Sequence, residues 1–235
     1  MPIVNRFALL RQWLEVCDNT HACLRSECQV WPKRVIFVGN KHSDRLQLKR
    51  SADLTHPIDY ISLSHCWGTA SDEEKEQFCT TPQNHDQRLN GLSYHGLPKV
   101  FQDAITVTRE LKKQYVWIDA LCIIQGSDDD WKEEGARMEE VFASAYCTIA
   151  SSSASHWKDG FLDRTQALDQ SEGNIHFGKN INEFRELVDK GSLNKRAWVL
   201  QERALSRRTI FFTAQQTYWE CGRGVRCEDF TTLNW

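Results

Sequence analysis

Four residues that directly follow a mostly apolar segment have side chains suited to binding a ligand: Ser64, His65, Trp67 and Gly68. An indole such as that of Trp67 can stack on an aromatic ring of a ligand, and a glycine lets the backbone approach a phosphate group. Residues 60–65 have the pattern of a short buried strand, so these side chains would stand at its end. The alternative is a buried strand end in which Trp67 is simply part of the core.

Cys66 lies between His65 and Trp67, which suggests a thiol nucleophile with a histidine base. Neighbouring residues of a strand point to opposite faces of its sheet, so Cys66 and His65 would not meet. A cysteine-dependent hydrolase would therefore need a more distant histidine, such as His156. The spacing favours a binding role for this block.

Glu134 is the acidic residue whose position most strongly suggests chemistry. It ends the pattern Trp-x-x-Glu that begins at Trp131, and it lies four residues before Met138. On a single helix this spacing places Glu134 on the inward face, near the N-terminal end, where the helix dipole offsets part of the cost of burying a carboxylate. The alternative is a structural carboxylate that pairs with Arg196 or Arg203.

Further polar residues follow the next apolar segment. Asp119 ends the segment 115–119, and Gln125 and Ser127 come shortly after it. Asp119 can bond to a ligand hydroxyl or orient another polar group, or it can bond to nearby backbone amides in a purely structural role. We expect all three residues to lie at the same edge of the sheet.

A helical pattern near the C-terminus brings together polar and aromatic side chains: Arg196, Trp198, Gln201, Glu202 and Arg203. Residues three and four positions apart on a helix are neighbours, so this group would form one cluster. The cluster can hold a phosphate or support Glu134, or it can be an internal polar network that fixes the helix to the core.

Nine cysteines are scattered along the chain. No secretory signal pattern follows the N-terminus, so we interpret the thiols as reduced and predict a cytoplasmic protein. One group near the N-terminus has metal-ligand types: Cys17, His21, Cys23 and Cys28. Its spacing is not a standard zinc pattern, so no metal is predicted and zinc is kept as the alternative, with Cys221 and Cys227 as further donors if the fold brings them near.

The elements that must position these residues alternate between two patterns. Helical spacing predicts helices at about 5–17, 97–111, 131–146, 181–189 and 196–205, and apolar runs predict strands at 34–38, 45–49, 60–65, 115–119, 147–150, 208–213 and 217–220. Predicted strands and helices alternate through residues 60–150. This alternation predicts an α/β fold with a largely parallel sheet, whose cleft lies beyond the carboxyl ends of the strands.

The domain organisation follows from the same pattern. Residues 1–58 are predicted to form an N-terminal extension, a helix plus a hairpin, packed on the core. Residues 59–235 form the main domain, with insertions at 69–96 and 156–195 and a β-hairpin at its C-terminal end.

Composition narrows the classes of function. The 235 residues carry 29 Lys and Arg against 32 Asp and Glu, so there is no basic excess for a nucleic acid backbone. With 40% hydrophobic residues the chain can bury a core, and it has no apolar run long enough to span a membrane.

Four blocks occur in a fixed order: Tyr60–Gly68, Leu97-Pro98 with Asp103–Ile105, Trp117–Gln125 and Arg196–Glu202. In this order they resemble the fungal heterokaryon incompatibility (HET) domain, and the resemblance extends from Trp13 to about Cys221. It implies a cell-death effector of fungal self/non-self recognition, a form of programmed cell death and innate immunity. HET domains are in turn remotely similar to Toll/interleukin-1 receptor (TIR) domains, which have a flavodoxin-like fold.

Some TIR domains cleave NAD at the nicotinamide–ribose bond with the glutamate of a Trp-x-x-Glu helix. The resemblance therefore implies an NAD glycohydrolase with Glu134 as the catalytic carboxylate, which would stabilise an oxocarbenium-like ribose. NAD is the expected substrate, with no permanently bound cofactor. The residues expected to bind it are Ser64, His65, Trp67, Gly68, Asp119, Gln125, Ser127, Trp131, Arg196, Trp198, Gln201 and Glu202.

Proteins of this type often act as assemblies. The expected partner is a second copy of the chain or another incompatibility protein, without nucleic acid. The alternative function is a non-catalytic signalling or oligomerisation domain that triggers death by recruiting partners.

Overall fold

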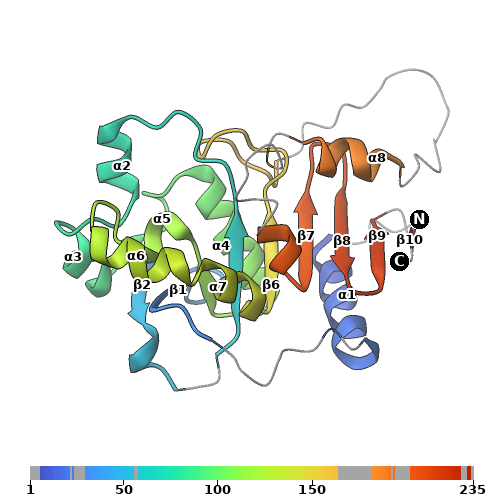
Figure 1. Cartoon of the computed structure of the whole chain (residues 1–235), viewed down its shortest axis with the longest axis horizontal. Coiled ribbons are helices and arrows are strands. Elements are labelled where there is room, and N and C mark those ends of the chain that lie inside the picture. The colour runs from blue at the N-terminus through green and yellow to red at the C-terminus, as the bar shows by residue number, and fades with distance from the viewer. Residues whose placement is uncertain are drawn as a thin grey trace.

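The computed structural model describes residues 6–21, 23, 30–55, 58–163, 182–191, 193, 202–228 and 232–233. Within these residues the strands are β1 Arg34–Phe37, β2 Arg45–Arg50, β3 Tyr60–Ser64, β4 Leu92–Ser93, β5 Tyr115–Trp117, β6 Cys147–Ala150, β7 Arg208–Phe212, β8 Thr217–Cys221, β9 Gly224–Cys227 and β10 Thr232–Leu233. They form one mixed sheet in the order β10-β9-β8-β7-β6-β3-β5-β1-β2-β4 (Figure 1).

The centre of the sheet is parallel. β3 pairs in parallel with β5 and β6, and β6 pairs in parallel with β7. In chain order these four strands lie 2-1-3-4 across the sheet, which is the order of flavodoxin-like folds. All residues of β3, β6 and β7 are buried, as expected of strands covered on both faces.

The predicted α/β class is confirmed, but a largely parallel sheet describes only these four strands. β1, β2 and β4 extend one side of the sheet by antiparallel pairing, and β8, β9 and β10 extend the other. The connections 38–44 and 213–216 are too short for a parallel crossover, so the strands they join return as hairpins.

Helices cover both faces of the parallel centre. The described helices are α1 Arg6–Thr20, α2 Asp72–Phe78, α3 His85–Asn90, α4 Lys99–Glu110, α5 Asp119–Cys122, α6 Asp128–Ala136, α7 Met138–Ser144 and α8 Asn182–Phe184, which continues into a π-helical turn at Arg185–Asp189. α4 links β3 to β5 on one face, and α6 and α7 lead from β5 to β6 on the other (Figure 1). No described helix has the length and apolar character needed to cross a membrane.

One predicted helix differs from the structure in two ways. The single helix expected at 131–146 is two helices, which break at Arg137 shortly after Gly135, a residue that weakens helices. α6 also begins three residues earlier than expected, because Ser127 caps it and accepts a hydrogen bond from the Asp130 N–H at 3.4 Å.

The predicted insertion 69–96 contains α2, α3 and β4, three elements that the sequence patterns did not predict. Ser71 and Glu74 form a reciprocal capping box at the start of α2, a local signal that composition alone does not reveal. In the predicted N-terminal extension, α1 buries Leu10, Trp13 and Cys17 and lies against β8.

Candidate functional site

A cavity of about 390 Å³ opens beyond the carboxyl ends of β3 and β5. It is lined by Leu63, His65, Trp67, Trp117, Asp119, Gln125, Trp131, Lys132, Gly135, Ala136, Met138, Phe142 and Glu202. Its volume falls within the range of small-molecule pockets, and aromatic walls with a few polar groups are typical of them. The position is that of the ligand crevice in open α/β sheets, beside the point where the strand order reverses.

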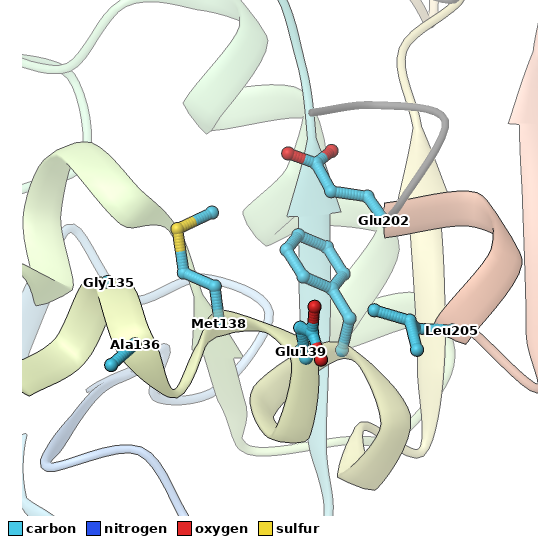
Figure 2. A pocket seen from close by; sticks show the side chains of 7 residues that line it. Gly135, Ala136, Met138, Glu139, Glu202 and Leu205 are labelled. Carbon is cyan, nitrogen blue, oxygen red and sulfur yellow. The ribbon is translucent and has the colours of Figure 1, made fainter. Parts of the chain in front are cut away.

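A second cavity of about 230 Å³ adjoins the first and shares five of its lining residues. Figure 2 shows Glu202 reaching into it from the helix at 202–205, with Met138 of α7 on the other side. Ser64, the last residue of β3, donates a hydrogen bond from its hydroxyl to Glu202 Oε2 at 2.5 Å. This bond fixes a carboxylate at the junction of the two cavities.

Asp119 organises the aromatic wall of the larger cavity. It is the first residue of α5, and its Oδ2 accepts a hydrogen bond from Trp67 Nε1 at 3.1 Å. Its Oδ1 accepts from the Ala120 N–H at 2.6 Å and lies 3.9 Å from His65 Nδ1. Asp119 therefore orients both rings, which agrees with an orienting role and leaves any direct bond to a ligand as a prediction.

Trp67 belongs to a group of packed rings and also reaches the cavity. Its indole stacks against His65 and Trp157, with ring centroids 6.4 Å and 5.8 Å away. The His65 ring makes a T-shaped contact with Phe101 of α4, while Cys66 packs with the cluster around Phe211. His65 and Cys66 thus diverge as the strand alternation predicted, and they do not form a dyad.

Glu134 lies behind the cavity rather than in its wall. Its side chain is 1% exposed, and Oε2 accepts a hydrogen bond from the Lys33 N–H at 3.2 Å. Oε1 lies 3.6 Å from a guanidinium nitrogen of Arg137. The same helix, α6, presents Trp131 and Lys132 to the cavity. The catalytic role of Glu134 therefore stays a prediction that would require α6 to move.

The electrostatic surroundings of Glu134 also differ from those expected. α6 begins at Asp128 and ends at Ala136, so Glu134 lies near the C-terminal end, where the helix dipole disfavours a negative charge. Burial raises the pKa of Glu134, with partial compensation from the Lys33 N–H and the nearby arginines. The alternative of a structural pair with Arg203 does not occur, because Arg203 binds Asp189 and Glu220, and Arg196 lies outside the described residues.

Asp130 shares the buried side of α6 with Glu134. It forms a buried ion pair with Arg34 and accepts a hydrogen bond from the Ile124 N–H at 2.8 Å. Burial alone would raise the pKa of Asp130, but these two hydrogen bonds hold it below its ordinary value. The pair ties α6 to the first residue of β1.

A protein-family model described as "Heterokaryon incompatibility protein (HET)" matches residues 60–202, which is more than half of the 235-residue chain. The chain belongs to the HET family. Comparison with curated proteins and with solved structures finds no match. The matched region begins with β3 and ends at Glu202, so every residue that lines the two cavities except Leu205 lies within it.

Other residues of the predicted HET site take different places. Gly68 has a positive φ of 68°, and a Cβ there would lie 2.2 Å from His156 Cδ2, so the histidine ring occupies the space a side chain would need. Gln125 lines the cavity, and its amide lies 3.4 Å from the Asp119 carbonyl oxygen. Ser127 caps α6 and is not part of the wall. Three predicted residues lie outside the described part of the chain: Arg196, Trp198 and Gln201.

Sequence reasoning missed several wall residues: Leu63, Trp117, Lys132, Gly135, Ala136, Met138 and Phe142. Most are apolar, and nothing local separates them from ordinary core residues. Lys132 could have been predicted from the sequence, since it is a cation that directly follows Trp131. The structure shows it exposed at the cavity.

Part of the N-terminal cysteine and histidine group also comes together. Cys17, His21 and Cys23 meet Cys221 of β8, with their donor atoms all within 4.8 Å of one another. Cys28 lies outside the described residues, and Cys227 bonds to Gln216 instead. All four residues of this cluster fall outside the region that matches the HET family.

Proposed function

We propose that this HET-family chain hydrolyses NAD at the nicotinamide–ribose bond and thereby acts in heterokaryon incompatibility as a cell-death effector. The observation that carries the proposal is a carboxylate, Glu202, held by Ser64 in the wall of a cavity that the indoles of Trp67 and Trp131 also line. The flavodoxin-like order of the parallel strands supports the same reading, since their carboxyl ends form a common place for nucleotides.

The wall of the cavity offers a contact for each part of the substrate. The indoles of Trp67 and Trp131 suit the nicotinamide and adenine rings, because aromatic faces stack on flat heterocycles. Lys132 is exposed at the same wall and suits the pyrophosphate. These contacts would bind NAD with its ribose near Glu202.

The reaction then needs one negative charge beside the ribose. As the N-glycosidic bond breaks, nicotinamide leaves as a neutral molecule with the bonding electron pair, and positive charge spreads over C1′ and the ring oxygen. A carboxylate close to this centre stabilises it, as in glycoside hydrolysis. Water then adds at C1′ and releases one proton, which yields ADP-ribose.

Two carboxylates compete for this role. The TIR resemblance implies Glu134, whereas the geometry favours Glu202, which faces the cavity and is oriented by Ser64. We assign charge stabilisation to Glu202. Glu134 then acts as a positioning residue that fixes the buried side of α6 and so places Trp131 and Lys132.

The test measures nicotinamide released from NAD by the purified chain across a wide range of protein concentration, because assembly can be required for activity. Glu202→Gln is expected to abolish release, while Glu76→Gln, at an exposed position on α2, is expected to leave it unchanged. Glu134→Gln is expected to weaken binding more than turnover. The proposal is refuted if the wild type releases no nicotinamide at any protein concentration. It is also refuted if neither Glu202→Gln nor Glu134→Gln reduces the release.

The non-catalytic alternative also has a specific observation in its favour. Trp131 is 51% exposed at the mouth of the cavity, whereas Glu134 is enclosed by protein. A large exposed indole suits contact with a partner or a second copy. Self-association that Trp131→Ser abolishes, in a protein without NAD hydrolysis, would establish this function instead.

A further inference from the structure

A cluster of metal-ligand side chains lies where α1 meets the end of β8, apart from the residues that line the cavities. It consists of Cys17, His21, Cys23 and Cys221, whose donor atoms all lie within 4.8 Å of one another. The sulfur of Cys221 is 3.4 Å from His21 Nδ1. Three thiols and an imidazole in one place form a complete set of zinc ligands.

Local structure explains how the cluster forms. Cys17 and His21 are four residues apart, and the His21 N–H donates to the Cys17 carbonyl oxygen at 3.2 Å, so the last turn of α1 puts both side chains on one face. Cys221 ends β8 and precedes Gly222. A Cβ at Gly222 would lie 3.3 Å from the Cys23 sulfur, so a larger residue would crowd this thiol.

The distances suit one tetrahedral ion. Zn–S bonds of about 2.3 Å and Zn–N bonds of about 2.0–2.1 Å place two sulfurs about 3.8 Å apart and a sulfur and a nitrogen about 3.6 Å apart. The observed 3.4 Å between Cys221 and His21 and the 4.8 Å limit for the whole set require only small side-chain adjustments. Four protein donors leave no position for substrate, which is the arrangement of structural sites.

The surroundings are also those of a structural metal site. Cys17 and Cys221 are 1% and 5% exposed, while His21 and Cys23 are half-buried and give an ion access from solvent.

We propose that Cys17, His21, Cys23 and Cys221 bind one zinc ion in a closed structural site. The ion joins α1 to β8 across 200 residues of sequence. It therefore connects two segments that flank the HET-matched region 60–202 and lie outside it. Its role is to hold the N-terminal helix on the antiparallel edge of the sheet.

The first experiment measures the metal content of the whole chain, purified under reducing conditions and then dialysed against zinc. One zinc per chain is expected. Cobalt in place of zinc is expected to give the thiolate charge-transfer absorption and the visible bands of a tetrahedral site. Cys227→Ser, a buried cysteine of β9 outside the cluster, is the matched control and keeps one zinc per chain.

Variants of the ligands distinguish this site from a chance grouping of thiols. Cys221→Ser is expected to lose stoichiometric zinc, while His21→Cys is expected to keep it, because four thiolates also bind zinc. Since ligand variants can fail to fold, the wild type is also compared with and without a chelator. Removal of the metal is expected to lower the Tm and to speed amide exchange in α1.

Three results would overturn the proposal. They are substoichiometric zinc in the reduced wild type after dialysis, zinc binding by Cys221→Ser equal to that of the Cys227→Ser control, and a Cys17–Cys221 disulfide in protein prepared with excess zinc.

Discussion

Asp130→Asn removes the negative charge from the buried ion pair that fixes α6. Arg34 and Asp130 are 7% and 8% exposed. Arg34 binds Asp130 and the Cys122 carbonyl oxygen, the latter at 2.7 Å, and Asp130 also accepts from the Ile124 N–H. Asparagine keeps the shape and one acceptor, so the main change is a guanidinium left buried without its counter-ion.

The expected loss follows from that uncompensated charge. Removing one partner of a buried pair costs about 3–5 kcal/mol of the free energy of unfolding. An unfolding entropy of about 2.1 cal/mol/K per residue gives about 0.5 kcal/mol/K for 235 residues, so a loss of about 4 kcal/mol lowers the Tm by about 8 °C. Because the pKa of Asp130 is lowered, this stabilisation is present above the ordinary value of 3.8 and is lost as pH falls through the lowered pKa.

Thermal and urea unfolding of wild type and variant measure the effect at neutral pH. Asp72→Asn is the control, since its pair with Lys75 on α2 is exposed and should contribute less than about 0.5 kcal/mol. Replacing both partners with apolar residues, Arg34→Met with Asp130→Leu, should recover part of the loss, because no charge stays buried while the Cys122 carbonyl and the Ile124 N–H lose these hydrogen bonds. The reasoning fails if Asp130→Asn lowers the free energy of unfolding by less than about 1 kcal/mol, or by no more than the control.

Two further variants test the backbone and the buried acid. Gly68→Ala should lower the free energy of unfolding by more than about 1–2 kcal/mol, the cost of a positive φ, because the new Cβ also clashes with His156. Gly126→Ala is the control, since Gly126 has a φ of 80° and open space around it, so this variant carries the backbone cost alone. Equal losses of the two variants in urea unfolding would contradict the clash. Burial raises the pKa of Glu134 above the ordinary 4.5, so the free energy of unfolding should fall as pH rises from 4.5 through the raised pKa. In urea titrations at several pH values, Glu134→Gln should reduce this dependence of the free energy of unfolding on pH. An unchanged pH dependence would exclude Glu134 as its source.

The strand ends could be predicted because their signals are local. Apolar runs at 60–64 and 147–150 become fully buried parallel strands, and the polar residues that follow such runs reach the sheet edge by geometry alone. His65, Trp67 and Asp119 were found in this way, and all three line the cavity.

The orientation of Glu134 could not be predicted for a specific reason. Four-residue spacing places Glu134 and Met138 on one face only if one helix carries both. The chain breaks at Arg137, so α7 rotates away from α6, and Met138 reaches the cavity while Glu134 faces Lys33. Gly135 weakens the helix at this point, but whether a helix breaks beside a glycine depends on tertiary packing, which a periodicity count does not contain.

Contacts between residues far apart in the sequence are the other feature that could not be predicted. Cys221 completes the cysteine and histidine cluster only because α1 packs against β8, a contact between elements 200 residues apart. The capping box of Ser71 and Glu74, by contrast, was readable in the sequence and would have identified α2.

The two outermost strands bear on how copies of the chain can associate. β4 and β10 have two residues each, and α3 lies against β2 beside β4, with Gln47 bonded to the Leu89 carbonyl oxygen at 2.7 Å. Within the described residues, edge strands this short offer few exposed backbone groups to an incoming strand, and proteins use short edge strands to prevent uncontrolled edge-to-edge pairing. Copies of this HET-family chain that associate would then do so through side-chain surfaces, which can be reversible, rather than by a growing backbone-bonded fibre.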